Sequence, residues 1–149
     1  MWTSLQPEIL IRMPDGMRNG VLHPANLDDT PPPRSAAQGW KKCIDSLLDI
    51  RLLEHDWDGQ GTPAPTVEVV DSAIILAVLL RQHHVVPPAV TVQSVTGSVL
   101  MEWQWADQTT FEIDVLEPGV ADLFLMVPGQ AVKYWQIKEC VAHFAGVTP

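Results

Sequence analysis

The chain has 149 residues, of which 46% are hydrophobic and 18% are charged, a balance typical of one soluble globular domain with a small core. Its formal net charge is −9 at pH 7. This argues against nucleic acid as a partner, because nucleic-acid-binding proteins neutralise phosphates with clustered Lys and Arg. An acidic surface suits a basic protein partner, or simply keeps the protein soluble.

The sequence predicts a cytoplasmic protein that does not bind membranes. The longest apolar run, Ala73–Leu80, is too short to span a bilayer. Met1–Ser4 leads to no long apolar run with a basic flank, so we expect no secretory signal. Cys43 and Cys140 lie far apart and form no metal-type pair. Buried free thiols are the preferred interpretation, and one disulfide is the alternative.

Residues 1–34 are expected to form an extended or flexible arm, and residues 35–149 a single domain. Within the arm, Glu8–Met13 could be a short strand closed by the turn Pro14-Asp15-Gly16. The Pro-rich end of the arm, Thr30–Arg34, cannot continue a helix.

Two helices are predicted next. The first runs from Ser35 to about Glu54, with apolar residues at spacings of three and four: Trp40, Cys43, Ile44, Leu47, Leu48 and Leu52. The second begins after the N-cap Thr66 and ends before Pro87-Pro88. It is apolar on more than one side, which predicts that it is largely buried.

Strand patterns follow. Residues 90–95 and 98–105 flank Thr96-Gly97, a two-residue hairpin signal that sets Val92 opposite Met101. A third strand, Thr109–Leu116, follows the loop Ala106-Asp107-Gln108. A loop of three residues places apolar residues of the second and third strands opposite one another on one inner face. Because side chains alternate between the two faces of a strand, a pairing shifted by one residue would set polar or charged residues on that buried face. The pairs are Trp103 with Phe111, Met101 with Ile113, and Val99 with Val115.

The fourth strand, Val120–Val127, breaks the alternation of apolar and polar residues. If Leu123 and Leu125 continue the inner face, Phe124 and Met126 point outward. A turn at Pro118-Gly119 that is one residue shorter would exchange the two pairs. Either way, two large apolar side chains stand on the outer face, and such a patch generally marks a contact. We expect the N-terminal arm, the C-terminal segment or a second chain to cover it.

The last segment, Gln130–Phe144, is predicted as a helix because its apolar residues have helical spacing. A fifth strand over Val132–Trp135 is the alternative. The resulting fold class is α+β, with two helices packed on one face of an antiparallel meander of about four strands.

The loop between the two helices resembles the start of a calcium loop. Asp56, Asp58 and Gln60 hold the first three ligand positions, and Gly61 the sixth. The match fails at the twelfth position, where Val67 replaces the required Glu. A shaped connector explains the same residues better: Gly59 and Gly61 can take positive φ, Asp58 can accept hydrogen bonds from nearby backbone N–H groups, and Trp57 can fill the gap between the helices.

Four features carry a resemblance to a group of small bacterial proteins that has no established activity. They are Trp57-Asp58-Gly59-Gln60-Gly61, a Pro-containing start to the next helix, Pro87-Pro88 before a strand, and Gly97-x-Val99-x-x-Glu102-Trp103. Members of the group share W-D-G-x-G, then P-x-V, then G-x-x-x-x-E-W. The likeness covers about residues 50–115, leaves both ends unmatched, and implies a shared fold without implying any catalytic residue.

An acidic patch is the second candidate site. The predicted register opposes Glu102 and Glu112 on the outer face, with Asp114 diagonal to them. Opposed carboxylates lie within about 5.5 Å at Cβ, close enough for acid/base chemistry. A solvated acidic patch is the preferred interpretation, because a carboxylate pair needs a pocket to act as an active site.

The sequence contains no recognisable enzyme signature, and no cofactor is expected. The preferred function is therefore a non-enzymatic interaction module with a protein partner or a second copy, for example an acidic inhibitor or an antitoxin-like partner of a basic protein. The alternative is a calcium-like metal protein using Asp56 and Asp58, or a carboxylate-based enzyme using Glu102 and Glu112.

Overall fold

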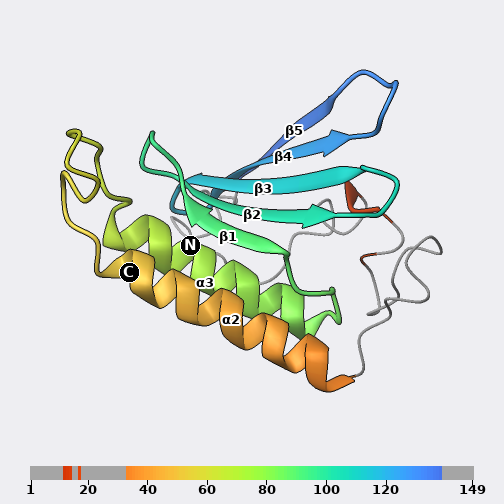
Figure 1. Ribbon diagram of the computed structural model, residues 1–149, viewed down its shortest axis with the longest axis horizontal. Coiled ribbons are helices and arrows are strands. Elements are labelled where there is room, and N and C mark those ends of the chain that lie inside the picture. The colour runs from red at the N-terminus through yellow and green to blue at the C-terminus, as the bar shows by residue number, and fades with distance from the viewer. Residues whose placement is uncertain (1–11, 15–16, 18–32, 139–149) are drawn as a thin grey trace, which may run out of the picture.

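The protein is described by a computed structural model that covers residues 12–14, 17 and 33–138. Helices α2 (Pro33–Arg51) and α3 (Val67–Gln82) lie side by side beneath one face of a five-stranded antiparallel sheet (Figure 1). The strands stand in chain order: β1 (Val90–Gln93), β2 (Val99–Gln104), β3 (Thr110–Glu117), β4 (Val120–Met126) and β5 (Lys133–Lys138). The predicted α+β class is confirmed, with one strand more than expected. Among the described residues, no helix is long and apolar enough to cross a membrane.

Helix α3 begins for the predicted reason, whereas α2 begins at Pro33, two residues before the predicted Ser35 and within the predicted arm, because proline is tolerated in the first turn of a helix. The Thr66 hydroxyl caps α3 by accepting a hydrogen bond from the Val69 N–H at 3.3 Å, and α3 is buried on more than one side. The predicted stripe was wrong at Leu48, which is 47% exposed on α2, and at Leu52, which follows the end of α2 and is 77% exposed. The helix buries Ile50 instead, because the line that faces the core runs through Trp40, Cys43, Leu47 and Ile50.

The inner face of the sheet has the predicted register across β2 and β3. Its three apolar pairs are confirmed: Trp103 with Phe111, Met101 with Ile113, and Val99 with Val115. All six side chains are buried against the helices. The rings of the first pair pack with their centroids 6.0 Å apart.

The predicted hairpin between β1 and β2 was wrong by one residue. Ser94 N–H donates to Ser98 O at 2.9 Å, so the loop is Val95–Gly97 rather than Thr96-Gly97, and Gly97 supplies the positive φ of 85°. Val92 therefore lies opposite Leu100, not Met101. Because a shift of one residue reverses the faces of a strand, Val90 and Val92 point away from the core.

β4 follows the first of the two predicted alternatives. Leu123 lies opposite Ile113 and Leu125 opposite Phe111, so Phe124 and Met126 lie on the outer face. The β3–β4 turn is tied to α3, because the Gly119 N–H donates to the Ser72 hydroxyl at 3.0 Å.

The C-terminal helix was wrong over the described residues, where Lys133–Lys138 forms strand β5. The alternative prediction, a fifth strand in this region, is confirmed. Trp135 and Ile137 pack against the core while Tyr134 and Gln136 face outward, so a period of two outweighs the helical spacing of more distant apolar residues. The rest of the predicted helix, including Cys140, lies outside the described residues, and Cys43 is a buried free thiol.

Part of the predicted N-terminal arm belongs to the core. Met13 and Met17 are buried, and Met17 N–H donates to Pro14 O at 3.0 Å, which closes the predicted turn. The Arg12 guanidinium lies 5.0 Å from the centre of the Trp135 ring. Arg12 and Met13 are not in a strand, and the remainder of the predicted strand lies outside the described residues.

The connector from α3 to β1 joins both layers. The Trp40 indole N–H of α2 donates to Val85 O at 3.0 Å, and that of Trp103 in β2 donates to Val86 O at 2.8 Å. Beside it, Gly39 leaves room for Pro87: a Cβ added at Gly39 would lie 2.5 Å from Pro87 Cγ. α2 can therefore approach the connector only with a glycine at this position.

Replacing Gly39 with Ala should destabilise the protein. Alanine is favoured over glycine in a helix by about 1 kcal/mol, but the rigid Pro87 ring cannot yield to the added methyl group. We expect a net loss of about 1–3 kcal/mol in the free energy of unfolding, measured by urea denaturation. Gln38→Ala, at the exposed neighbouring position, is the matched control. Equal stability of the two variants would contradict this account of the packing.

Candidate functional site

In the loop between α2 and α3, the side-chain carboxylates accept hydrogen bonds from residues of the same loop. Asp58 Oδ1 accepts hydrogen bonds from Gln60 N–H at 2.9 Å and Thr62 N–H at 3.3 Å, and Asp58 Oδ2 accepts one from the Thr62 hydroxyl. These bonds lower the pKa of Asp58, with the Thr62 hydroxyl as the largest cause. Asp56 Oδ1 accepts from Gly61 N–H at 2.5 Å. The loop is shaped by its own hydrogen bonds.

This geometry does not favour a calcium site. Asp56 Oδ1 and both carboxylate oxygens of Asp58, three of the oxygens that would coordinate the ion, already accept hydrogen bonds within the loop. In the part of the chain that the structure describes, no group of three or more His, Cys, Asp or Glu side chains is arranged to hold a metal. Gly59 and Gly61 have φ of 72° and 81°, as the connector interpretation expects.

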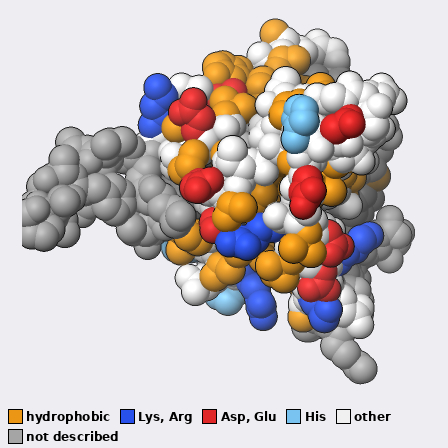
Figure 2. Space-filling model, turned by 90° about the vertical axis from the view of Figure 1, so that its left-hand side faces the viewer, with side chains coloured by type: hydrophobic (Ala, Val, Ile, Leu, Met, Phe, Trp, Pro, Cys, Tyr) orange, Lys and Arg blue, Asp and Glu red, His pale blue; other side chains and the backbone are white. Residues whose placement is uncertain are grey.

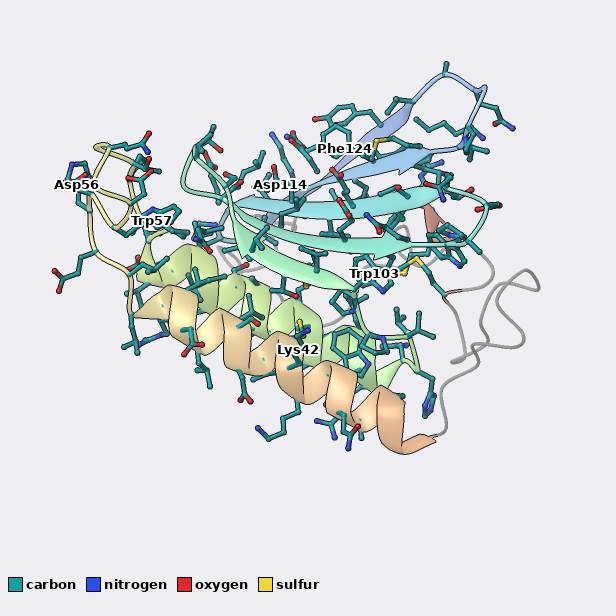
Figure 3. The ribbon with its side chains drawn as sticks, in the orientation of Figure 1. Lys42, Asp56, Trp57, Trp103, Asp114 and Phe124 are labelled. Carbon is teal, nitrogen blue, oxygen red and sulfur yellow. The ribbon has the colours of Figure 1, made fainter. Side chains whose placement is uncertain are left out.

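Trp57 is half-buried at the base of this loop (Figure 3). Its indole N–H is buried without a hydrogen-bond partner among the described residues. The loop lies against the tip of the β1–β2 hairpin, where a Cβ added at Gly97 would be 3.9 Å from Pro63 Cγ. Over this end of the molecule, acidic and basic side chains are interspersed with hydrophobic ones (Figure 2). Neither sign of charge dominates this end.

The outer face of the sheet differs from this end of the molecule, because carboxylates gather there and lie opposite one another across the strands. Glu102 lies directly opposite Glu112, as the predicted β2–β3 register requires. The bond from Trp105 N–H to Thr109 O fixes which pairs of this hairpin exchange hydrogen bonds. By alternation, Glu102 and Glu112 form a non-hydrogen-bonded pair, the kind whose Cα atoms are only about 4.5 Å apart.

Burial and the closeness of Glu102 together raise the pKa of Glu112. Partial burial raises the pKa of Glu112, and a hydrogen bond to Glu102, the charge of Glu102 and the charge of Asp114 raise it further. The fold thus disfavours the charged form of Glu112. Glu102 also accepts a hydrogen bond from the Gln104 amide.

A second carboxylate pair lies beside the first. Asp114 on β3 is directly opposite Asp122 on β4. Burial raises the pKa of Asp114, the charge of Asp122 adds to the effect, and a hydrogen bond from Ser98 opposes it. Asp114 Oδ1 is buried and has no hydrogen-bond partner in the described part of the chain.

Aromatic side chains border the carboxylates. Phe124 lies next to Glu112 across the strands and packs on Tyr134, with ring centroids 5.1 Å apart. The Tyr134 hydroxyl donates to Asp122 Oδ1 at 2.8 Å. Figure 3 shows Asp114 and Phe124 on the side of the sheet away from the helices, and Trp103 on the helix side. We call Glu102, Glu112, Asp114, Asp122, Phe124 and Tyr134 the acidic face.

The sequence placed part of this surface correctly. Glu102, Glu112, Asp114 and Phe124 lie together as expected, and Met126 lies one row further along β4, opposite Thr110. Asp122 and Tyr134 were missed. Asp122 is the one polar residue of Val120–Val127, and no role was predicted for it, whereas Tyr134 was predicted to lie in a helix. The alternation of Tyr134 and Gln136 with Trp135 and Ile137 was the signal that could have found the outer row of β5.

Searches of protein-family models, of curated proteins and of solved structures each return no match for this chain. The resemblance to small bacterial proteins therefore stays a prediction. The opposed pair Glu102 and Glu112 has a spacing that an acid/base catalyst can use, so the enzyme alternative stays a prediction as well.

The raised pKa of Glu112 predicts a pH dependence of stability. A raised carboxyl pKa in the folded state means that its stabilising contribution is complete below the ordinary value of about 4.3 and is lost as pH rises through the raised value. Glu112→Gln cannot ionise and should escape that loss. At pH 7 we expect it to be more stable than the wild type by about 0.2–1 kcal/mol.

Denaturant titrations at pH 4 and pH 7 measure this difference, which should shrink towards pH 4. Glu117→Gln is the control, because Glu117 is exposed at the end of β3 and should show no such gain. A Glu112→Gln variant that is no more stable than the wild type at pH 7 would show that the two glutamates do not repel each other.

Proposed function

We propose that this protein is a non-enzymatic interaction module that binds a basic partner protein through the acidic face. The observation that carries the proposal is that two pairs of carboxylates face each other directly on adjacent strands. Glu102 lies opposite Glu112, and Asp114 lies opposite Asp122. Like charges placed directly opposite each other destabilise a sheet. A cationic partner would convert this repulsion into attraction.

The neighbouring side chains support a protein as the partner. Phe124 and Met126 are half-buried, and Tyr134 is 51% exposed. Aromatic residues and methionine are enriched at protein interfaces, where they supply apolar contact area. An apolar strip beside a charged row offers both the contact area and the electrostatic complementarity of a specific interface.

The overall charge agrees with this assignment. At a formal net charge of −9, the protein attracts a basic partner from a distance and accelerates their encounter. An acidic inhibitor or antitoxin-like partner of a basic protein is the concrete form that we propose. A cytoplasmic location would suit this role and belongs to the same proposal.

Affinity capture with matched variants tests the proposal. The immobilised wild type should retain a basic protein from an extract of the cells that produce it. The variant Glu102→Gln/Glu112→Gln/Asp114→Asn should lose that protein. The variant Asp49→Asn/Glu54→Gln/Glu117→Gln removes as many charges from exposed positions elsewhere, and it should retain the protein.

The purified partner should then bind the wild type in calorimetry, with an affinity that falls as salt increases. Equal loss of binding in both variants would indicate that only net charge matters. Retention by the acidic-face variant would contradict the proposal.

A further inference from the structure

The two edges of the sheet differ in how well they are protected. Within the described residues, β1 and β5 are the edge strands. β5 begins with Lys133 and ends with Lys138, and lysines on an edge strand hinder pairing with another chain. The four residues of β1, Val90–Gln93, carry no charge. β1 therefore lacks this protection against a further strand.

The backbone of β1 is oriented to accept such a strand. Ser94 N–H donates to Ser98 O across the hairpin. Because alternate residues of an antiparallel strand direct their backbone groups to the same neighbour, the even-numbered residues of β1 face β2. The N–H and C=O groups of Thr91 and Gln93 therefore face away from the sheet, where a sixth strand would lie.

A hollow lies beside the free edge of β1. A hollow of about 240 Å³ lies between α2 and β1. Cys43 and Ser46 line it from α2, and Ala89 and Thr91 line it from the strand side. These side chains are small, and the Thr91 hydroxyl donates to Cys43 Sγ at 3.3 Å. The inward side chains of an added strand would find space there, beside the exposed Lys42 that also lines the hollow.

The outer side of the same edge leads to the acidic face. Val90 and Val92 are 37% and 39% exposed, and Val90 lies directly opposite Glu102. Neighbouring strands are about 4.8 Å apart. An outward residue of the added strand would therefore lie two strands from Glu102, with only Val90 between them. An arginine there can lay its apolar stem on Val90 and place its guanidinium at Glu102, the partner of Glu112 in the next strand.

We propose that the basic partner is bound by strand addition: an extended basic segment pairs antiparallel with β1 as a sixth strand. Its cationic residues face outward to the acidic face, and small or polar residues face the hollow. The inference rests on the proposed function, since it takes the partner's charge from there. It adds a mode of recognition in which backbone hydrogen bonds supply affinity and alternate side chains supply specificity.

The probe is an acetylated, amidated heptapeptide in which Thr alternates with Arg, titrated into the full-length protein. Hydrogen exchange should show the amides of Thr91 and Gln93 becoming protected when the peptide binds. The amides of Val90 and Val92, which already face β2, should change little. A peptide with Glu in place of Arg should not bind.

Backbone methylation separates strand pairing from simple charge attraction. In the antiparallel arrangement the threonine N–H groups of the peptide point to β1 and the arginine N–H groups point away. Methylating the threonine nitrogens should weaken binding by about tenfold or more, because strand hydrogen bonds are lost. Methylating the arginine nitrogens, at the same charge and with the same number of methyl groups, should have little effect.

The outcomes distinguish the two proposals. Binding that requires Glu102 and Glu112 but responds equally to both methylation patterns, with no new protection at Thr91 and Gln93, would overturn strand addition and leave the proposed function standing. Protection of those two amides that persists in Glu102→Gln/Glu112→Gln would support strand addition and count against the acidic face. No binding of the Arg peptide at millimolar concentration would contradict both.

Discussion

The arrangement of the layers depends on the hydrogen bonds that the Trp40 and Trp103 indole groups donate to the carbonyls of Val85 and Val86. A carbonyl buried without a partner is costly, so both rings are held in place. One ring comes from α2 and the other from β2, and the Val86 N–H donates to Met17 O at 3.1 Å. The connector between α3 and β1 thereby joins the helices, the sheet and the N-terminal segment at one point. It also sets where β1 begins relative to α2.

This constraint decides which face of the sheet the helices leave uncovered. With α2 and α3 fixed beneath the inner face (Figure 1), the carboxylates of β2, β3 and β4 stand together on the other side. Their mutual repulsion lowers stability, and surface features retained at a cost in stability are often functional. The same constraint places α2 under the free edge of β1, where residues of α2 line the hollow.

The sequence predicted the parts of the fold in which one physical signal dominated. Trp103, Met101 and Val99 recur at every second residue, and only one register with β3 sets all three opposite apolar residues. Val90-Thr91-Val92-Gln93 offered an apolar face that the structure turns outward, because the Gly97 turn adds a residue to the loop. Lys133–Lys138 carried helical and strand signals at once, and pairing with β4 decided between them. The acidic face was predicted where it rests on the β2–β3 register and was missed at Asp122 on β4 and at Tyr134 on β5.

Which face is the interface is the central question, and hydroxyl-radical footprinting of the full-length protein, alone and with its captured partner, tests it most directly. The alternative surface is that of α2 and its C-terminal end, where Leu48 and Leu52 are exposed. Phe124, Met126 and Tyr134 should lose reactivity when the partner binds, while Leu48 and Leu52 should keep theirs. Protection of the two leucines with unchanged reactivity of Phe124, Met126 and Tyr134 would contradict the assignment of the acidic face as the binding surface.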